Sequence, residues 1–215
     1  MAVSPDEFAR RTLAHYEEKF ALHGETPQGV DWNGAASQSL QFDQLLRLLP
    51  AAGAFSVNDL GCGYGALLSM LDERYAGVRY GGYDLNESMI EAARRRFGER
   101  PDTTFQVADR PDRTADYGLA SGIYTLRLGR SDAECLSSMV ASLDLLDATS
   151  LAGFGFNCLT SYSDAPKMKD YLYYPDPCVV FDTCKRRFSR DVALLHDYGL
   201  YAFTILVRKS PPSAT

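Results

Sequence analysis

The sequence predicts an α/β protein in which a doubly wound, mostly parallel sheet carries helices on both faces. The first observation is an apolar run over 55–60 that enters a glycine loop and then a helical pattern over 66–71. The second is that later strand-like runs end in acidic residues and alternate with helical patterns. The third is a pair of strand-like runs around Tyr198-Gly199, which indicates a closing antiparallel hairpin. With 215 residues, the chain fits one such domain.

Residues 1–50 are expected to form a helical cap or lid ahead of the sheet. The segment Ser4-Pro5-Asp6-Glu7 favours a helix start, because serine caps a helix and proline suits its first position. Apolar residues recur at helical spacing over 8–20, and Gly24 is expected to end the helix. This helix is interpreted either as part of the core or as a cover for a ligand.

A polar, glycine-rich passage follows and contains the only tryptophan of the chain, Trp32. We expect the passage to shape a pocket, because loops often carry function and tryptophan offers a large contact surface; a surface connector is the alternative. A second amphipathic helix is predicted over 37–49 and ends at Pro50.

The loop after the first strand reads Asp59-Leu60-Gly61-Cys62-Gly63-Tyr64-Gly65. Its glycines permit a close approach of the backbone, and the carboxyl edge of such a sheet is where ligands bind. Two ligand classes compete for it. A dinucleotide fingerprint is G-x-G-x-x-G, whereas this loop is G-x-G-x-G. Asp59 would repel a phosphate but would attract an ammonium group, which favours S-adenosylmethionine as the ligand.

The loop resembles the first motif, D/E-x-G-x-G-x-G, of the class I S-adenosylmethionine-dependent methyltransferases. The resemblance covers roughly 37–207, and 151–207 also resembles a bacterial subgroup that acts on small molecules. It implies a Rossmann-like three-layer sandwich over 51–210, with a seven-stranded sheet whose last strand is antiparallel. It also implies that S-adenosylmethionine lies at the carboxyl edge of that sheet.

Two further strands end in acids that are candidate cofactor contacts. Asp84 ends a strand over 78–84 and lies 23 residues after Gly61, a spacing that places a carboxylate against the ribose hydroxyls. Leu85 is then expected to pack on adenine. A strand over 103–109 ends in Asp109, which the resemblance places near the adenine amino group, with Arg110 beside it.

The fourth strand, over 116–124, is expected to end beside the reactive part of the cofactor, because strand order reverses between strands one and four. Its last residues are therefore candidates for contacts with the amino-acid moiety and the substrate. The predicted cofactor contacts are Gln38, Asp59, Gly61, Cys62, Gly63, Asp84, Leu85, Asp109, Arg110, Ser121 and Gly122. The predicted substrate contacts are Trp32, Tyr124 and Thr125.

Catalytic candidates come from the last third of the chain. A capping box over 131–134 opens a scaffold helix, and the fifth strand over 151–159 carries Asn157 near its end. The loop over 160–177 holds four tyrosines, whose rings are suited to enclosing a sulfonium by cation–π attraction. An insertion packed by its own aromatic residues is the alternative. The predicted catalytic residues are Asn157, Tyr162, Tyr171 and Tyr174.

Composition narrows the class of protein. A net charge of −6 argues against a nucleic-acid binder, and no apolar run is long enough to span a membrane. The five cysteines are odd in number and form no C-x-x-C pair, so we expect no metal site and a reduced, cytoplasmic location. The sequence gives no indication of oligomeric state.

The predicted function is methyl transfer to a small molecule by in-line displacement, which depends mainly on positioning. Two alternatives remain open. In one, the enzyme releases methylthioadenosine, either by cyclisation of the amino-acid part of the cofactor or by transfer of its aminocarboxypropyl group. In the other, the protein binds the cofactor without turnover.

Overall fold

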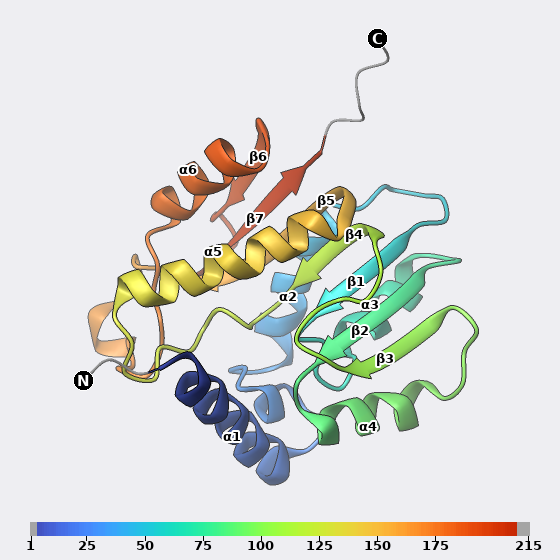
Figure 1. Ribbon diagram of the computed structural model, residues 1–215, viewed down its shortest axis with the longest axis horizontal. Helices are drawn as coiled ribbons and strands as arrows, with labels where there is room; N and C mark the ends of the chain where they lie inside the picture. Colours follow the sequence, from blue (N-terminus) through green and yellow to red (C-terminus); the bar gives the residue numbers. More distant parts are fainter. Residues whose placement is uncertain (1–3, 210–215) are drawn as a thin grey trace.

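The computed structural model describes residues 4–209, and within them seven strands form one sheet (Figure 1). Residues 1–3 of the predicted cap and residue 210 of the predicted sandwich lie outside this range. The strands are β1 (Ser56–Leu60), β2 (Arg79–Asp84), β3 (Thr103–Val107), β4 (Ala115–Ala120), β5 (Ser150–Leu159), β6 (Asp191–Leu195) and β7 (Ala202–Arg208). Their order is β3-β2-β1-β4-β5-β7-β6, and β7 runs antiparallel to both of its neighbours. The predicted fold class is confirmed.

Helices cover both faces of the sheet, as the alternating pattern predicts. The helices are α1 (Pro5–His23), α2 (Ala35–Leu46), α3 (Ala66–Arg74), α4 (Glu87–Phe97), α5 (Asp132–Ala148) and α6 (Pro177–Arg187), with short 3-10 turns η1 (Pro27–Val30) and η2 (Ala165–Lys167). Apolar side chains of α2, α3 and α4 join one buried core, and those of α5 and α6 join a second core. Figure 1 shows α5 and α6 in front of the sheet, with α2 and α3 behind it.

The helix ends follow their predicted caps. The Ser4 hydroxyl accepts a hydrogen bond from the Glu7 amide, and Gly24 ends α1. Ser131 and Glu134 form the predicted capping box at the start of α5. Helix α6, for which the sequence analysis made no prediction, begins after Asp176, whose side chain caps it.

Two element boundaries differ from the predicted ones in ways that shape the site. β4 ends at Ala120 instead of continuing to 124, because the chain turns at Gly122 with a φ of +79°. Helix α2 packs against β5 and β7 and contributes Phe42 and Leu46 to the core, so it belongs to the sandwich. Within the described residues, α1 contributes no side chain to either core.

The register brings the carboxyl ends of three central strands together. Leu60 at the end of β1 pairs with Tyr83 of β2 and with Ala120 of β4. The loops that leave these strands therefore meet at one edge of the sheet. Figure 1 shows α1 lying across that edge.

Candidate active site

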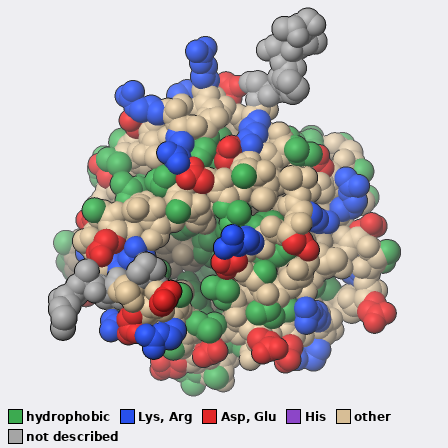
Figure 2. Space-filling view, in the orientation of Figure 1, with side chains coloured by type: hydrophobic (Ala, Val, Ile, Leu, Met, Phe, Trp, Pro, Cys, Tyr) green, Lys and Arg blue, Asp and Glu red, His purple; other side chains and the backbone are tan. Residues whose placement is uncertain are grey.

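A cavity of about 260 Å³ lies where α1 crosses the carboxyl edge of the sheet. Figure 2 shows a hollow with hydrophobic side chains around it, next to the position that α1 occupies in Figure 1. The cavity is lined by the glycine loop, the ends of β2 and β4, and residues of α1 and η1. Of the predicted contacts, those that line it are Trp32, Gln38, Asp59, Gly61, Cys62, Gly63, Asp84, Leu85, Asp109, Ser121 and Gly122.

The glycine loop is held against β2 and packs on the turn after β4. The amides of Gly61 and Cys62 donate to the carbonyl oxygen of Tyr83, at 2.7 and 3.2 Å. Gly61 has a φ of +74°, and a Cβ atom there would lie 2.0 Å from a methyl carbon of Ile123. Glycine is therefore required at this position for both its backbone conformation and its close contact.

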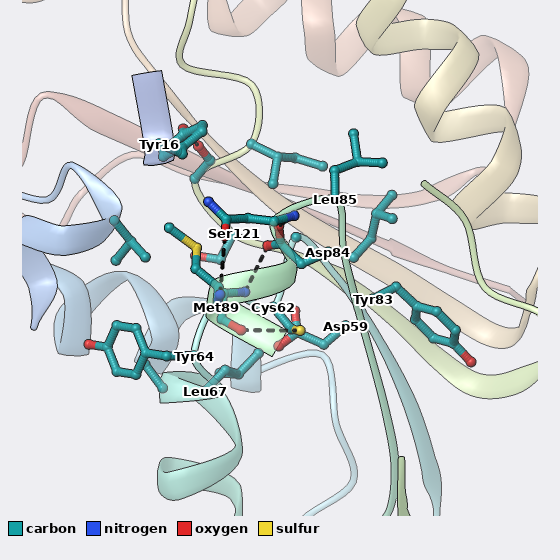
Figure 3. A pocket seen from close by; sticks show the side chains of 18 of the residues that line it. Tyr16, Asp59, Cys62, Tyr64, Leu67, Tyr83, Asp84, Leu85, Met89 and Ser121 are labelled. Atoms are coloured by element: carbon teal, nitrogen blue, oxygen red, sulfur yellow. Dashed lines mark hydrogen bonds between the residues drawn. The ribbon is translucent and has the colours of Figure 1, made fainter. Parts of the chain in front are cut away.

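Asp84 is a preorganised acceptor at the centre of the site (Figure 3). One carboxylate oxygen accepts from the Gly63 amide at 2.9 Å, and the other accepts from the Asn86 amide at 2.8 Å. Burial raises the pKa of Asp84, while these backbone hydrogen bonds oppose the rise. Each carboxylate oxygen keeps a free lone pair, so the side chain has acceptor capacity for two hydroxyl groups of a ligand.

Asp59 lies beneath the glycine loop, and its residue surface is 2% exposed. Its carboxylate accepts a hydrogen bond from the Tyr80 hydroxyl at 2.6 Å. Burial raises the pKa of Asp59 to about 7, and the nearby charge of Asp84 adds to the rise. A bound cation close to this carboxyl group would favour its ionised form.

Asp109 and Arg110 follow β3 at the outer rim of the cavity. They form a two-bond ion pair at 2.8 and 2.9 Å, and the hydrogen bond from Arg110 lowers the pKa of Asp109. Asp109 lines the cavity, whereas Arg110 lies outside the described lining. Leu85 also lines the cavity and is half exposed, so it offers an apolar contact surface to a ligand.

The turn after β4 is fixed by Asn157, which is buried in β5. Its side-chain oxygen accepts from the Gly122 amide at 3.0 Å, and its side-chain nitrogen donates to the Ser121 hydroxyl at 3.0 Å. The Trp32 ring packs on the same turn, so a Cβ atom added to Gly122 would lie 3.2 Å from it. Asn157 itself does not line the cavity among the residues described there, so its contacts are those of a positioning residue.

Tyr16 is a cavity residue that no sequence motif predicted. Its ring lines the cavity from α1 (Figure 3), and its hydroxyl donates to the carbonyl oxygen of Gly122 at 3.3 Å. The same hydroxyl lies 3.4 Å from the hydroxyl of Thr125, which also donates to Gly122. Burial raises the pKa of Tyr16 to about 12. Its only sequence signal is its place on the apolar face of α1.

The structure does not bring the three tyrosines predicted to be catalytic into the cavity. Tyr162 is 66% exposed and packs against His196, Tyr171 packs against His15, and the Tyr174 hydroxyl accepts from the Lys169 amide. The loop that carries them is tied to the chain after β4 by backbone hydrogen bonds, which hold it outside the site.

Two residues predicted to contact the substrate also lie away from the cavity. Tyr124 is buried in the core, where its ring packs on Phe156 and its hydroxyl lies 2.9 Å from that of Ser142. Thr125 reaches the site only through its contact with Tyr16 and Gly122. The early end of β4 accounts for both placements, because the chain turns at Gly122 before it reaches Tyr124 and Thr125.

Two further features are absent from the described part of the chain. Within residues 4–209, no helix is long and apolar enough to cross a membrane. In the same part of the chain, no three His, Cys, Asp or Glu side chains are placed to hold a metal ion.

Comparison with known proteins agrees with this geometry. A family model described as a methyltransferase domain matches residues 58–127. The Mycobacterium tuberculosis protein Rv1506c, provisionally named a methyltransferase, is 58% identical over 165 residues, which cover 77% of this chain and 99% of that protein. Trans-aconitate 2-methyltransferase of Delftia acidovorans is 35% identical over 86 residues, 37% of this chain and 31% of that enzyme.

A solved structure supports the fold. The 1,6-didemethyltoxoflavin-N1-methyltransferase of Burkholderia thailandensis superposes with a TM-score of 0.67 at 17% identity, over 98% of this chain and 92% of that chain. The match to Rv1506c covers nearly all of that protein, and together with the matched methyltransferase domain it establishes the family. The chain belongs to the class I S-adenosylmethionine-dependent methyltransferases, and S-adenosylmethionine is its cofactor.

Proposed function

We propose that this methyltransferase acts on a small molecule, with both reactants enclosed in the cavity at the carboxyl edge. The observation that carries the proposal is the roof over the cavity: Thr12, Leu13 and Tyr16 of α1 lie across the glycine loop and the end of β4. A polymeric substrate needs an open groove, whereas α1 covers part of this cavity. The net charge of −6 also disfavours nucleic acid as the substrate.

The cofactor contacts follow from the chemistry of each lining group. Asp84 accepts from the two ribose hydroxyls, and Leu85 packs on adenine while Asp109, held by Arg110, accepts from the adenine amino group. Asp59 attracts the ammonium group of the amino-acid moiety from beneath the loop. The remaining contacts with that moiety come from Gln38, Gly61, Cys62, Gly63, Ser121 and Gly122.

When bound, S-adenosylmethionine supplies a methyl group that its sulfonium has already activated. The residues of this chain therefore act by orientation and by excluding water. Tyr16 and Asn157 fix the Gly122 turn from opposite sides, through its carbonyl oxygen and its amide. That turn borders the reactive end of the site, so its position sets the line along which the acceptor approaches.

The cap is proposed to be smaller than the predicted segment 1–50. Helix α1 and η1 act as the lid, because α2 is packed into the sandwich. Within the lid, Asp31 at the end of η1 contacts His15 at 2.9 Å and Lys19 at 3.1 Å, which holds η1 against α1. Opening of this lid would admit both reactants.

The two alternative functions lack a supporting observation. Release of methylthioadenosine was suggested by a tyrosine enclosure, and the three tyrosines proposed for it do not line the cavity. Incubation with S-adenosylmethionine and a mixture of small metabolites tests the proposal. Mass spectrometry should detect S-adenosylhomocysteine together with a product heavier by one methyl group. Methylthioadenosine as the main product would instead support the first alternative.

A further inference from the structure

The cavity has a second side that the cofactor contacts leave unused. It is formed by Thr12, Leu13 and Tyr16 of α1 together with Ile123 and Ser142. Resting on the proposed function, we propose that this side is the acceptor site and that it takes an uncharged small molecule with an apolar body. In this proposal the Thr12 hydroxyl and the Tyr16 hydroxyl orient a single polar group of the acceptor.

The geometry of α1 places these two side chains on one face. Thr12 and Tyr16 are four residues apart, so their side chains lie on one face of the helix, and that face lines the cavity. The Thr12 hydroxyl oxygen is buried and has no hydrogen-bond partner among the described residues. A buried hydroxyl group without a partner is unfavourable, so a ligand that supplies one gains affinity.

The charges of the lining decide which acceptors fit. Three carboxylates, those of Asp59, Asp84 and Asp109, border the cavity. Among the lining residues that the structure describes, none is lysine, arginine or histidine. A carboxylate or phosphate on the acceptor would therefore find no cationic side chain of the lining to pair with. The match to the trans-aconitate 2-methyltransferase covers 37% of this chain. Its substrate is a tricarboxylate, which does not suit this lining.

The chemistry of transfer adds a second requirement. A lone pair on the acceptor forms the bond to the methyl carbon, the carbon–sulfur bond breaks, and its electron pair stays on sulfur. The positive charge passes to the acceptor, which keeps it or releases a proton to water. The Tyr16 hydroxyl stays protonated at neutral pH, since burial raises its pKa to about 12. An acceptor whose lone pair is free at neutral pH, such as a heteroaromatic nitrogen, satisfies this requirement.

Matched pairs of small heteroaromatic amides and carboxylates test the proposal. Nicotinamide and nicotinate, and pyrazinamide and pyrazinoate, differ mainly in charge, and each is titrated into the protein saturated with S-adenosylhomocysteine. Calorimetry measures the affinity, and the fluorescence of Trp32, which lines the cavity, reports binding there. We expect at least one amide to bind roughly tenfold more tightly than its carboxylate partner.

Substitutions in α1 test whether this helix determines the affinity for the amides. Thr12→Val is expected to weaken amide binding about three- to tenfold, because it removes one hydrogen bond. Tyr16→Phe is expected to weaken it at least as much, because it also removes the hydrogen bond to the Gly122 carbonyl. Thr12→Ser keeps the hydroxyl and should bind as the wild type does. Thr183→Val is the matched control, since that hydroxyl donates to a carbonyl on the remote helix α6.

Three results would overturn the acceptor-site proposal: a carboxylate that binds as tightly as its amide, no amide binding to the loaded protein, or unchanged affinity in both α1 variants. Failure of the wild-type protein to bind S-adenosylhomocysteine is a different outcome. It would contradict the proposed function itself, and calorimetry with the cofactor product alone distinguishes the two.

Discussion

Replacing Asp84 with asparagine is expected to weaken the binding of S-adenosylmethionine roughly 100-fold. Both carboxylate oxygens already accept from backbone amides, those of Gly63 and Asn86, and their remaining lone pairs face the ligand. An asparagine has one acceptor oxygen and one amino group, so one ribose hydroxyl loses a charged acceptor and one backbone amide faces another donor. Loss of a hydrogen bond to a charged group, with weakening of the second, costs about 3 kcal/mol.

Isothermal titration calorimetry with S-adenosylhomocysteine measures the effect, and circular dichroism checks that the variant remains folded. Asp109→Asn is the matched control. That carboxylate is exposed and already paired with Arg110, so its loss is expected to cost less than about tenfold in affinity. A folded Asp84→Asn protein that binds within about threefold of the wild type would refute the reasoning.

Three further predictions follow from the buried groups around the site. Asp59 has its pKa raised to about 7, so the folded protein keeps a proton that the unfolded chain releases above about pH 4. This contribution to the free energy of unfolding is present at low pH, and up to about 4 kcal/mol of it is lost as the pH rises to about 7. Urea denaturation at a series of pH values measures the loss, and Asp59→Asn should flatten that part of the pH profile. Gly61→Val should abolish cofactor binding, measured by calorimetry, because a Cβ atom would lie 2.0 Å from Ile123. Asn157→Leu should lower kcat/KM by about tenfold or more, because the buried Gly122 amide loses its acceptor.

Each of these predictions has a control and a result that would contradict it. An Asp59→Asn protein with the wild-type pH profile would show that this carboxyl group is not the source of the slope. Gly199→Val controls for positive φ alone, since Gly199 has a φ of +70° and open space around its Cβ position. Equal cofactor binding by both glycine variants would contradict the steric argument. For Asn157, Asn157→Asp retains the acceptor and should lose less activity than Asn157→Leu.

The strands and the cofactor side of the site were predictable because their signals are local. An apolar run, a glycine loop and a capped helix are contiguous, and parallel strands bring their carboxyl ends to one edge. Asp59 and Asp84 therefore reached the cavity although 25 positions separate them in sequence. Ser121 and Gly122, predicted from the same argument, also line the cavity, although β4 ends before them at Ala120.

The lid and the tyrosine loop depend on long-range contacts that a sequence pattern does not encode. Tyr16 reaches Gly122, 106 residues away, through the path of η1 and the turn after β4. The loop around Tyr171 is held by backbone bonds to 127 and 128, which no side-chain pattern indicates. Helix α6 was missed although Asp176-Pro177 is a cap signal, because its apolar residues gather in one short run over 178–181 that shows no helical period.

Hydrogen–deuterium exchange on addition of S-adenosylhomocysteine tests the central claim most directly, since it locates the bound cofactor on the chain. The account predicts slower exchange in α1, in the glycine loop over 60–65, and in the segments 84–86 and 121–123. It predicts no change over 160–174, where the tyrosines lie outside the cavity. Protection over 160–174 without protection of the glycine loop would contradict the account.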